Sequence, residues 1–209
     1  MSELNAEELL TRLKSGDEKA LGELYSLHRD RLKQMLEFRM DRRLRGRADA
    51  SDILQEVYID AHERMRHYLK KPEMSFYIWL RQLTTQRLID IHRRHLLAEK
   101  RDAKQEISIH QRMAAATSAS MAALLVAHLA SPSQMAMRAE LVEQIENALE
   151  KMDAVDREVL ALRHFEELRN GEVAEVLGLK PAAASNRYVR ALSRLRDVLE
   201  EMPGFTGDV

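Results

Sequence analysis

Aromatic and basic side chains lie close together over residues 66–94, and their types suit the binding of an unpaired nucleic acid strand. Within the expected loop 66–74, these side chains are His67, Tyr68, Lys70 and Lys71. Aromatic rings stack on exposed bases, and neighbouring cations neutralise the phosphates. The helix expected to follow adds Arg81, Arg87, Arg93 and Arg94. We interpret this segment as a candidate single-strand surface. The alternative is an ordinary core helix whose polar side faces water.

A second candidate surface is the acidic side of the helix expected just before that loop. The polar residues outside its apolar stripe are Asp49, Asp52, Gln55, Glu56 and Glu63. Such a face could dock on a basic protein surface. Carboxylates near a helix N-terminus are also stabilised by the helix dipole, so a face that meets only water is an equal alternative.

The C-terminal part of the chain has the pattern of a helix-turn-helix. A short helix capped by Asn170 precedes a turn closed by Gly178 and a long basic helix with Pro181 in its first turn. Recognition helices present their N-terminal half to the major groove, and the residues there are Ser185, Asn186, Arg187 and Arg190. Arg194 and Arg196 are expected to meet phosphates or the acidic face of the same unit. The alternative is three helices that pack only for stability.

Sequence patterns typical of catalysis and metal binding are missing. The chain has no cysteine, no glycine-rich phosphate loop and no nucleophile elbow, and no paired carboxylates stand out from solvated helix faces. His92 and His95 share a helix face without a third ligand. We therefore expect a protein that is not an enzyme and that has no metal, no cofactor and no small-molecule substrate.

Composition indicates a cytoplasmic protein. The 209 residues carry a formal net charge of −1, and the absence of cysteine fits a reducing compartment. The acidic, amphipathic N-terminus is unlike a signal peptide. The apolar run Met121–Ala130 has roughly half the length that a membrane span needs, so we expect no membrane insertion.

Apolar residues recur at helical spacing and glycine and proline are scarce, so we predict an all-α fold. The length suits two small helical domains joined by a flexible linker. The first spans residues 1–95, the linker 96–137, the second 138–202 and a tail 203–209. The linker is rich in Ala, Ser and Met, with few large side chains to bury.

Turn and capping residues place the helix boundaries within these domains. Gly16–Asp17 marks a turn, Asp49 or Ser51 caps the acidic helix, and Ser75 caps the next one. Asp153 caps a helix of the second domain. Trp79 is assigned to the core of the first domain.

Five stretches of the sequence, in order, carry a family resemblance. They are GDEKALGELYSLHRDRL, DASDILQEVYIDAHERM, WLRQLTTQRLIDIHRR, LEKMDAVDREVLALRHFEEL and GEVAEVLGLKPAAASNRYVRALSRLRDVL. Together they resemble the bacterial RNA polymerase sigma factors of the sigma-70 family, extracytoplasmic-function (ECF) group. The resemblance covers nearly all of both domains. It implies a region 2-like helical bundle followed by a region 4-like helix-turn-helix.

The resemblance also implies residue roles. The acidic helix would dock on the clamp helices of core RNA polymerase through Asp49, Asp52, Gln55 and Glu56. The following loop would capture a base flipped from the −10 element, through His67, Tyr68, Lys70 and Lys71. The next helix would contact the −10 element through Arg81, Gln86, Asp90, Arg93 and Arg94. The last helix would contact the −35 element through Lys180, Ser185, Asn186, Arg187 and Arg190.

Two departures from the family pattern concern DNA contacts. Gln86 stands where the family usually has Asn. Lys180 and Ala182–Ala183 stand where the family often has a Ser cap and a Gly-Thr pair. The promoter preferences of the family therefore cannot be carried over position by position.

We therefore expect a transcription initiation factor that binds core RNA polymerase and promoter DNA, recognises −35 and −10 elements and aids melting. An anti-sigma factor is one route by which another chain could control it. One rival is a stand-alone helix-turn-helix regulator with an N-terminal dimerisation or sensing module, which predicts palindromic sites. The other is an adaptor that binds a protein and no DNA, which leaves the basic helix after Lys180 unexplained.

Overall fold

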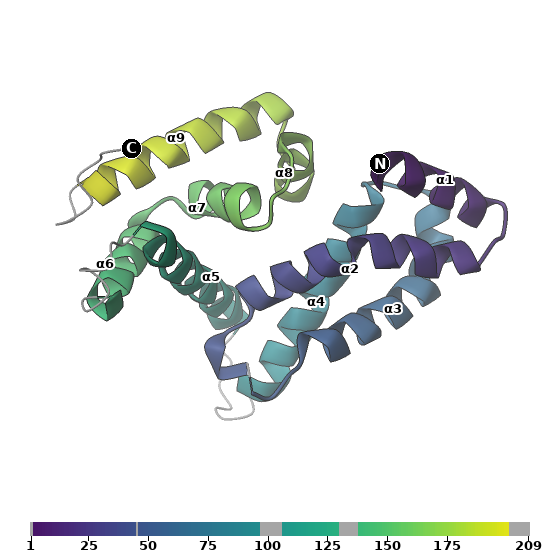
Figure 1. The fold of residues 1–209 in the computed structure, drawn as a ribbon, viewed down its shortest axis with the longest axis horizontal. Helices are drawn as coiled ribbons and strands as arrows, with labels where there is room; N and C mark the ends of the chain where they lie inside the picture. Colours follow the sequence, from purple (N-terminus) through teal and green to yellow (C-terminus); the bar gives the residue numbers. More distant parts are fainter. Residues whose placement is uncertain (1, 45, 97–105, 130–137, 201–209) are drawn as a thin grey trace. The chain divides into compact units, whose positions relative to one another are not determined.

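The computed structural model describes residues 2–44, 46–96, 106–129 and 138–200, and every regular element in these ranges is helical (Figure 1). The all-α prediction is confirmed. The helices are α1 (Ser2–Lys14), α2 (Lys19–Arg39), the 3₁₀ turn η1 (Arg42–Leu44), α3 (Ala50–Lys70), α4 (Phe76–Leu96), α5 (Glu106–Leu129), α6 (Arg138–Lys151), α7 (Ala154–Leu160), the π-helical turn η4 (Ala161–Phe165), α8 (Asn170–Leu177) and α9 (Pro181–Glu200). None of the helices in the described ranges is long and apolar enough to cross a membrane.

The chain divides into two compact units. The first comprises Met1–Glu37 and Arg42–Gln105, and the second comprises Phe38–Asp41 and Glu106–Val209. The first unit therefore holds the expected single-strand and acidic surfaces. The second holds the helix-turn-helix.

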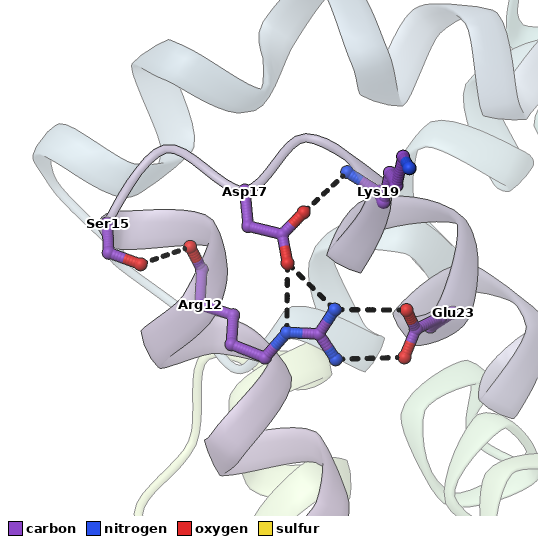
Figure 2. A network of polar contacts seen from close by, with 5 residues as sticks. All are labelled: Arg12, Ser15, Asp17, Lys19 and Glu23. Carbon is purple, nitrogen blue, oxygen red and sulfur yellow. Dashed lines mark hydrogen bonds and ion pairs between the residues drawn. The ribbon is translucent and has the colours of Figure 1, made fainter.

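The turn between α1 and α2 is fixed by a polar network around Arg12 (Figure 2). Its guanidinium donates to Oδ2 of Asp17 at 2.7 and 3.0 Å and to the carboxylate of Glu23 at 3.0 and 3.1 Å. The Asp17 carboxylate also accepts from the Lys19 amide at 3.1 Å. The hydrogen bonds from Arg12 lower the pKa of Asp17. Gly16, at φ 95°, makes the predicted turn.

Helix α3 begins where the sequence predicts, because Asp49 is its N-cap and its side chain accepts from the Ser51 amide at 2.6 Å. Its apolar stripe is buried and includes Ile53, Leu54, Val57, Ala61 and Met65. Helix α4 lies against α3 (Figure 1) and begins directly after Ser75, whose carbonyl accepts from the Trp79 amide at 3.0 Å. The two helices therefore present their outward sides as neighbouring surfaces.

The second unit includes a helix within the segment predicted to be a flexible linker. Helix α5 packs along α6, and its buried residues include Thr117, Ser118, Met121, Ala122 and Val126. Small side chains allow two helices to approach closely, and an Ala-rich stretch favours helix. The part 106–129 of the predicted linker thus belongs to the core of the second unit. Residues 97–105, 130–137 and the predicted tail lie outside the described residues.

The helix-turn-helix is formed by α8 and α9. The N-cap of α8 is Arg169, whose amide donates to Glu172 Oε2 at 2.8 Å, so the predicted cap, Asn170, lies one residue inside the helix. The side-chain amide of Asn170 donates instead to the carbonyl of Pro181 at 2.9 Å, and this hydrogen bond links α8 to α9. Gly178, at φ 62°, ends α8 in the left-handed conformation. These contacts set where α9 leaves the turn (Figure 1).

Candidate nucleic-acid and protein interfaces

The predicted docking residues form one face of α3. Asp52 and Gln55 are exposed, Asp49 is an exposed N-cap, and Glu56 is half-buried. The structure adds Ile59, which lies one turn beyond Gln55 and Glu56 and is 57% exposed. Its position, three and four residues after predicted contacts, was the signal that could have identified it from sequence. An apolar side chain surrounded by polar ones is the usual make-up of a protein-binding surface.

Ion pairs join this face to α4. Arg87 donates to both oxygens of Asp60 at 2.6 Å, and its Nη1 lies 3.4 Å from Glu56 Oε2. Arg94 Nη2 lies 3.9 Å from the same oxygen. A cleft of about 500 Å³ lies over these contacts, lined by Glu56, Ile59, Arg87, Asp90, Arg93 and Arg94. One of the predicted docking residues and three of the predicted −10 residues thus line one cleft.

Tyr68 supports the α3–α4 loop from inside. Its side chain is 7% exposed, its ring stacks on Trp79 with centroids 4.6 Å apart, and its hydroxyl donates to the Met74 carbonyl at 3.0 Å. This differs from the predicted role of Tyr68 in stacking on a base, because a buried ring presents no open face. The predicted loop 66–74 begins later in the structure, because His67 and Lys70 lie in the last turn of α3. Both are exposed, as is Lys71 in the loop itself, which pairs with Glu73 at 2.7 Å.

The predicted −10 residues of α4 divide by exposure. Gln86, Asp90, Arg93 and Arg94 are exposed, and Gln86 Oε1 accepts from Arg64 at 3.4 Å. Arg81 is 7% exposed, so the structure places it in the interior rather than on the predicted DNA surface. A helix with several arginines does not reveal from sequence which of them points inward.

The predicted −35 residues lie on α9, except Lys180, which directly precedes it. Lys180, Ser185, Asn186 and Arg190 are exposed. Arg187 instead reaches back to α7, where its Nη1 donates to Asp156 Oδ1 at 2.8 Å and to Asp153 Oδ1 at 3.2 Å. The other oxygen of Asp156 accepts from Arg194 at 2.9 Å. Of the two contacts expected for Arg194, phosphates or the acidic face of its own unit, the structure shows the second.

Asp156 and Asp153 explain this arrangement. Asp156 is 2% exposed, and a buried carboxylate requires charged or hydrogen-bonding partners. Asp153 caps α7 by accepting from the amides of Val155 and Asp156, as predicted. These backbone hydrogen bonds, with Arg187 as a further cause, lower the pKa of Asp153. The outward side of α9 carries one large apolar residue that sequence reasoning missed, Val189, which is 63% exposed.

Comparisons with known proteins agree with this division into two units. Residues 24–96 match the family model described as sigma-70 region 2, and residues 142–195 match the one described as sigma-70, region 4. The chain is 24% identical over 200 residues to the ECF RNA polymerase sigma factor SigW of Bacillus subtilis, with 96% of this chain and 100% of that protein covered. It is 34% identical over 155 residues to the probable RNA polymerase sigma factor RfaY of Xanthomonas campestris, covering 73% of this chain and 34% of that longer protein.

Among solved structures, CnrH in complex with the cytosolic domain of CnrY has a similar fold. The TM-score is 0.53 at 22% identity, with 94% of this chain and 97% of that chain covered. Both sigma-70 regions are present in the family's order. The chain therefore belongs to the sigma-70 family of RNA polymerase sigma factors, in its extracytoplasmic-function group.

Proposed function

We propose that this sigma factor binds core RNA polymerase through α3, contacts the −10 element through the α3–α4 loop and α4, and contacts the −35 element through α9. The observation that carries the proposal is the separation of exposed surfaces between the units. An acidic face and a basic face adjoin on the first unit, and a basic recognition helix belongs to the second. A two-part promoter requires two such DNA-contacting units.

The docking face is Asp52, Gln55 and Glu56, with the apolar Ile59 at its C-terminal end and Asp49 at its N-terminal end. An acidic rim favours a basic partner surface and speeds encounter with it. Ile59 supplies the apolar area that a stable interface needs, since charged residues at a rim contribute little affinity alone.

The −10 surface consists of exposed residues at the end of α3, on the following loop and on α4: His67, Lys70, Lys71, Gln86, Asp90, Arg93 and Arg94. The lysines and arginines attract the phosphates, which supply most of the affinity for DNA. Tyr68 holds this surface in place from the interior, through its stack on Trp79 and its hydrogen bond to the Met74 carbonyl. An extruded base costs a few kcal/mol to unstack, so a preformed loop would lower the free energy that melting requires.

Control by another chain is part of the proposal. A protein of similar fold, CnrH, has been solved in complex with the cytosolic domain of CnrY. We expect an anti-sigma protein to bind this chain at surfaces that core polymerase and DNA also use, because those surfaces carry Ile59 and Val189, the two most exposed large apolar residues among those described.

Binding to purified bacterial core RNA polymerase tests the proposal. Wild type should bind tightly, and Asp52→Arg should weaken binding at least tenfold. Asp30→Arg makes the same change of charge at an exposed position of α2 and should bind like wild type. Failure of the folded wild type to bind would favour the stand-alone regulator, which would then be tested as a dimer on palindromic DNA.

A further inference from the structure

The outward side of α9 has an uncharged centre. At about 100° per residue, the side of α9 opposite the buried Ala184, Ala191 and Leu195 carries Ala182, Asn186, Val189 and Ser193 over residues 182–193, and all four are exposed. Charged residues, Asp197 and Glu200, follow on this side only in the last turn of α9. Val189, at 63% exposed, is the most exposed large hydrophobic residue among those that the structure describes. A recognition helix with this stripe would present one amide, one hydroxyl and two apolar groups to the groove, and Val189 is the larger of the two apolar groups.

The cations of α9 lie beside this stripe or behind it. Arg190 and Arg196 are exposed at its two edges, and Arg196 pairs with Glu200 at 2.6 Å. Lys180 precedes the helix. Arg187 and Arg194 are both held by the buried carboxylate of Asp156. An arginine at the centre of the stripe could recognise guanine through its O6 and N7, but the centre of this stripe has none. The flanking cations are placed to meet phosphates instead.

Asn186 and Val189 have complementary chemistry toward A·T pairs. An Asn side chain hydrogen-bonds bidentately to N6 and N7 of adenine, and an apolar side chain contacts the C5-methyl group of thymine. Residues three apart on a helix rise about 4.5 Å, and base pairs are stacked about 3.4 Å apart. The two side chains can therefore reach adjacent base pairs.

We propose that α9 recognises neighbouring A·T pairs in the −35 element, with Asn186 bound to an adenine and Val189 in contact with a thymine methyl group. Arg190 meets a phosphate at the same site. Val189 is then a specificity-determining residue of this sigma factor. The inference rests on the proposed −35 role of α9 and names the bases that α9 distinguishes.

The test uses holoenzyme assembled from core polymerase and the full chain. It selects bound DNA from a library with a randomised −35 window, first for wild type, then for Val189→Ala and Asn186→Ala. Wild type should enrich an A and a T at adjacent base pairs. Val189→Ala should lose the thymine preference and keep the adenine, and Asn186→Ala should do the reverse. Ser193→Ala, at the far end of the stripe, should keep both.

A second measurement isolates the methyl group. Replacing the selected thymine by deoxyuridine removes only that methyl, and wild-type holoenzyme should bind about fourfold more weakly, as expected for one apolar carbon left in water. Val189→Ala should bind the two DNAs equally. The assignment of Val189 would be overturned if deoxyuridine weakened the binding of wild type and Val189→Ala equally. It would also be overturned if Val189→Ala still selected thymine as wild type does. If wild type enriches nothing in the −35 window, both this inference and the proposed −35 role fail.

Discussion

The ring of Tyr68 lies almost parallel to the indole of Trp79, with an angle of 24° between the planes and 4.6 Å between the centroids. The ring of Phe76 packs against both, with its centroid 5.7 Å from that of Tyr68 and 5.6 Å from that of Trp79. The hydroxyl of Tyr68 also holds the carbonyl of Met74. The Tyr68 side chain thus contacts α4 through its ring and the loop between α3 and α4 through its hydroxyl. We therefore expect this loop to have one preferred conformation.

Substitutions at Tyr68 should separate its ring from its hydroxyl. Tyr68→Phe keeps the stack and loses one hydrogen bond, so the free energy of unfolding should fall by about 1 kcal/mol. Tyr68→Ala loses the ring as well, and the fall should be about 3–5 kcal/mol. Urea denaturation measures both. A Tyr68→Phe protein with wild-type stability but greatly weakened −10 binding would show that the hydroxyl contacts DNA instead.

Arg87 should not be replaceable by lysine. Its guanidinium binds both oxygens of Asp60, and a lysine ammonium cannot reproduce this two-pronged geometry. Arg87→Lys should lower the free energy of unfolding by about 2 kcal/mol, measured by chemical denaturation. Arg93→Lys, at an exposed position of the same helix, is the matched control and should leave stability unchanged. Equal effects of the two variants would argue against the Arg87–Asp60 contact.

Substitution of Arg187 should affect stability, whereas substitution of Arg190 should affect DNA binding, although both residues lie on the recognition helix. Arg187→Ala removes one of two cations from the buried Asp156, and the free energy of unfolding should fall by about 1–3 kcal/mol. Arg190→Ala should leave stability unchanged. It should weaken promoter binding by holoenzyme and lower the slope of binding against salt by about 1.

The double variant Arg187→Ala/Asp156→Asn checks this assignment, because it removes the buried charge together with its partner. Its stability should exceed that of Arg187→Ala. Core polymerase binding should persist in all three variants, since α9 belongs to the other unit. An Arg187→Ala protein with full stability and a reduced salt slope would place Arg187 on the DNA.

The contribution of Asp153 to the stability of the fold should decrease in acid. Its pKa is lowered below the ordinary value of 3.8, first by the amide of Asp156. A carboxyl group with a lowered folded-state pKa contributes stability above its unfolded-state pKa and loses it as the pH falls through the folded-state value. Asp153→Asn keeps a capping side chain but does not titrate. The thermal stability of wild type should exceed that of Asp153→Asn at neutral pH, and the difference should shrink in acid. A difference independent of pH would contradict the assignment.

Two glycines of the helix-turn-helix provide a matched pair. Gly178 has φ +62°, whereas Gly171 lies in the first turn of α8, and neither would bring an added Cβ within 4 Å of another atom. Gly178→Ala should lower the free energy of unfolding by about 1 kcal/mol, because the left-handed conformation is strained for alanine. Gly171→Ala should be neutral or slightly stabilising. Thermal unfolding of both variants measures the difference.

The parts of the fold that were predictable from sequence depend on local chemistry. Asp49 and Asp153 cap helices because a short acceptor side chain satisfies amides two or three residues ahead. Gly178 marks the turn because few other residues adopt its left-handed conformation. Pro181 marks the start of the next helix because its ring presets a helical φ and its missing N–H is not needed there. Such signals require no knowledge of what packs on the helix. The division into two units was predicted instead from the length of the chain and from the few large side chains of residues 96–137.

The parts that were not predictable depend on partners distant in sequence. Arg187 and Arg190 are alike in sequence, and only the position of Asp156 separates an internal contact from an exposed cation. Tyr68 and Arg81 are polar enough to suggest a surface, and tertiary packing buries them. Helix α5 has few large side chains, so its own sequence does not predict that it packs against α6.

Helix α5 has a consequence for genetics. Its residues Met121, Ala122 and Val126 share one core with Ala191 and Leu195 of α9, although they lie outside both matched sigma-70 regions. A substitution such as Val126→Asp would disrupt the core on which the recognition helix packs, although Val126 is not a proposed DNA contact. A screen for alleles that no longer respond to the −35 element should therefore recover mutations in α5. Those alleles would be inherited as promoter defects, although they arise in a stretch that resembles a spacer.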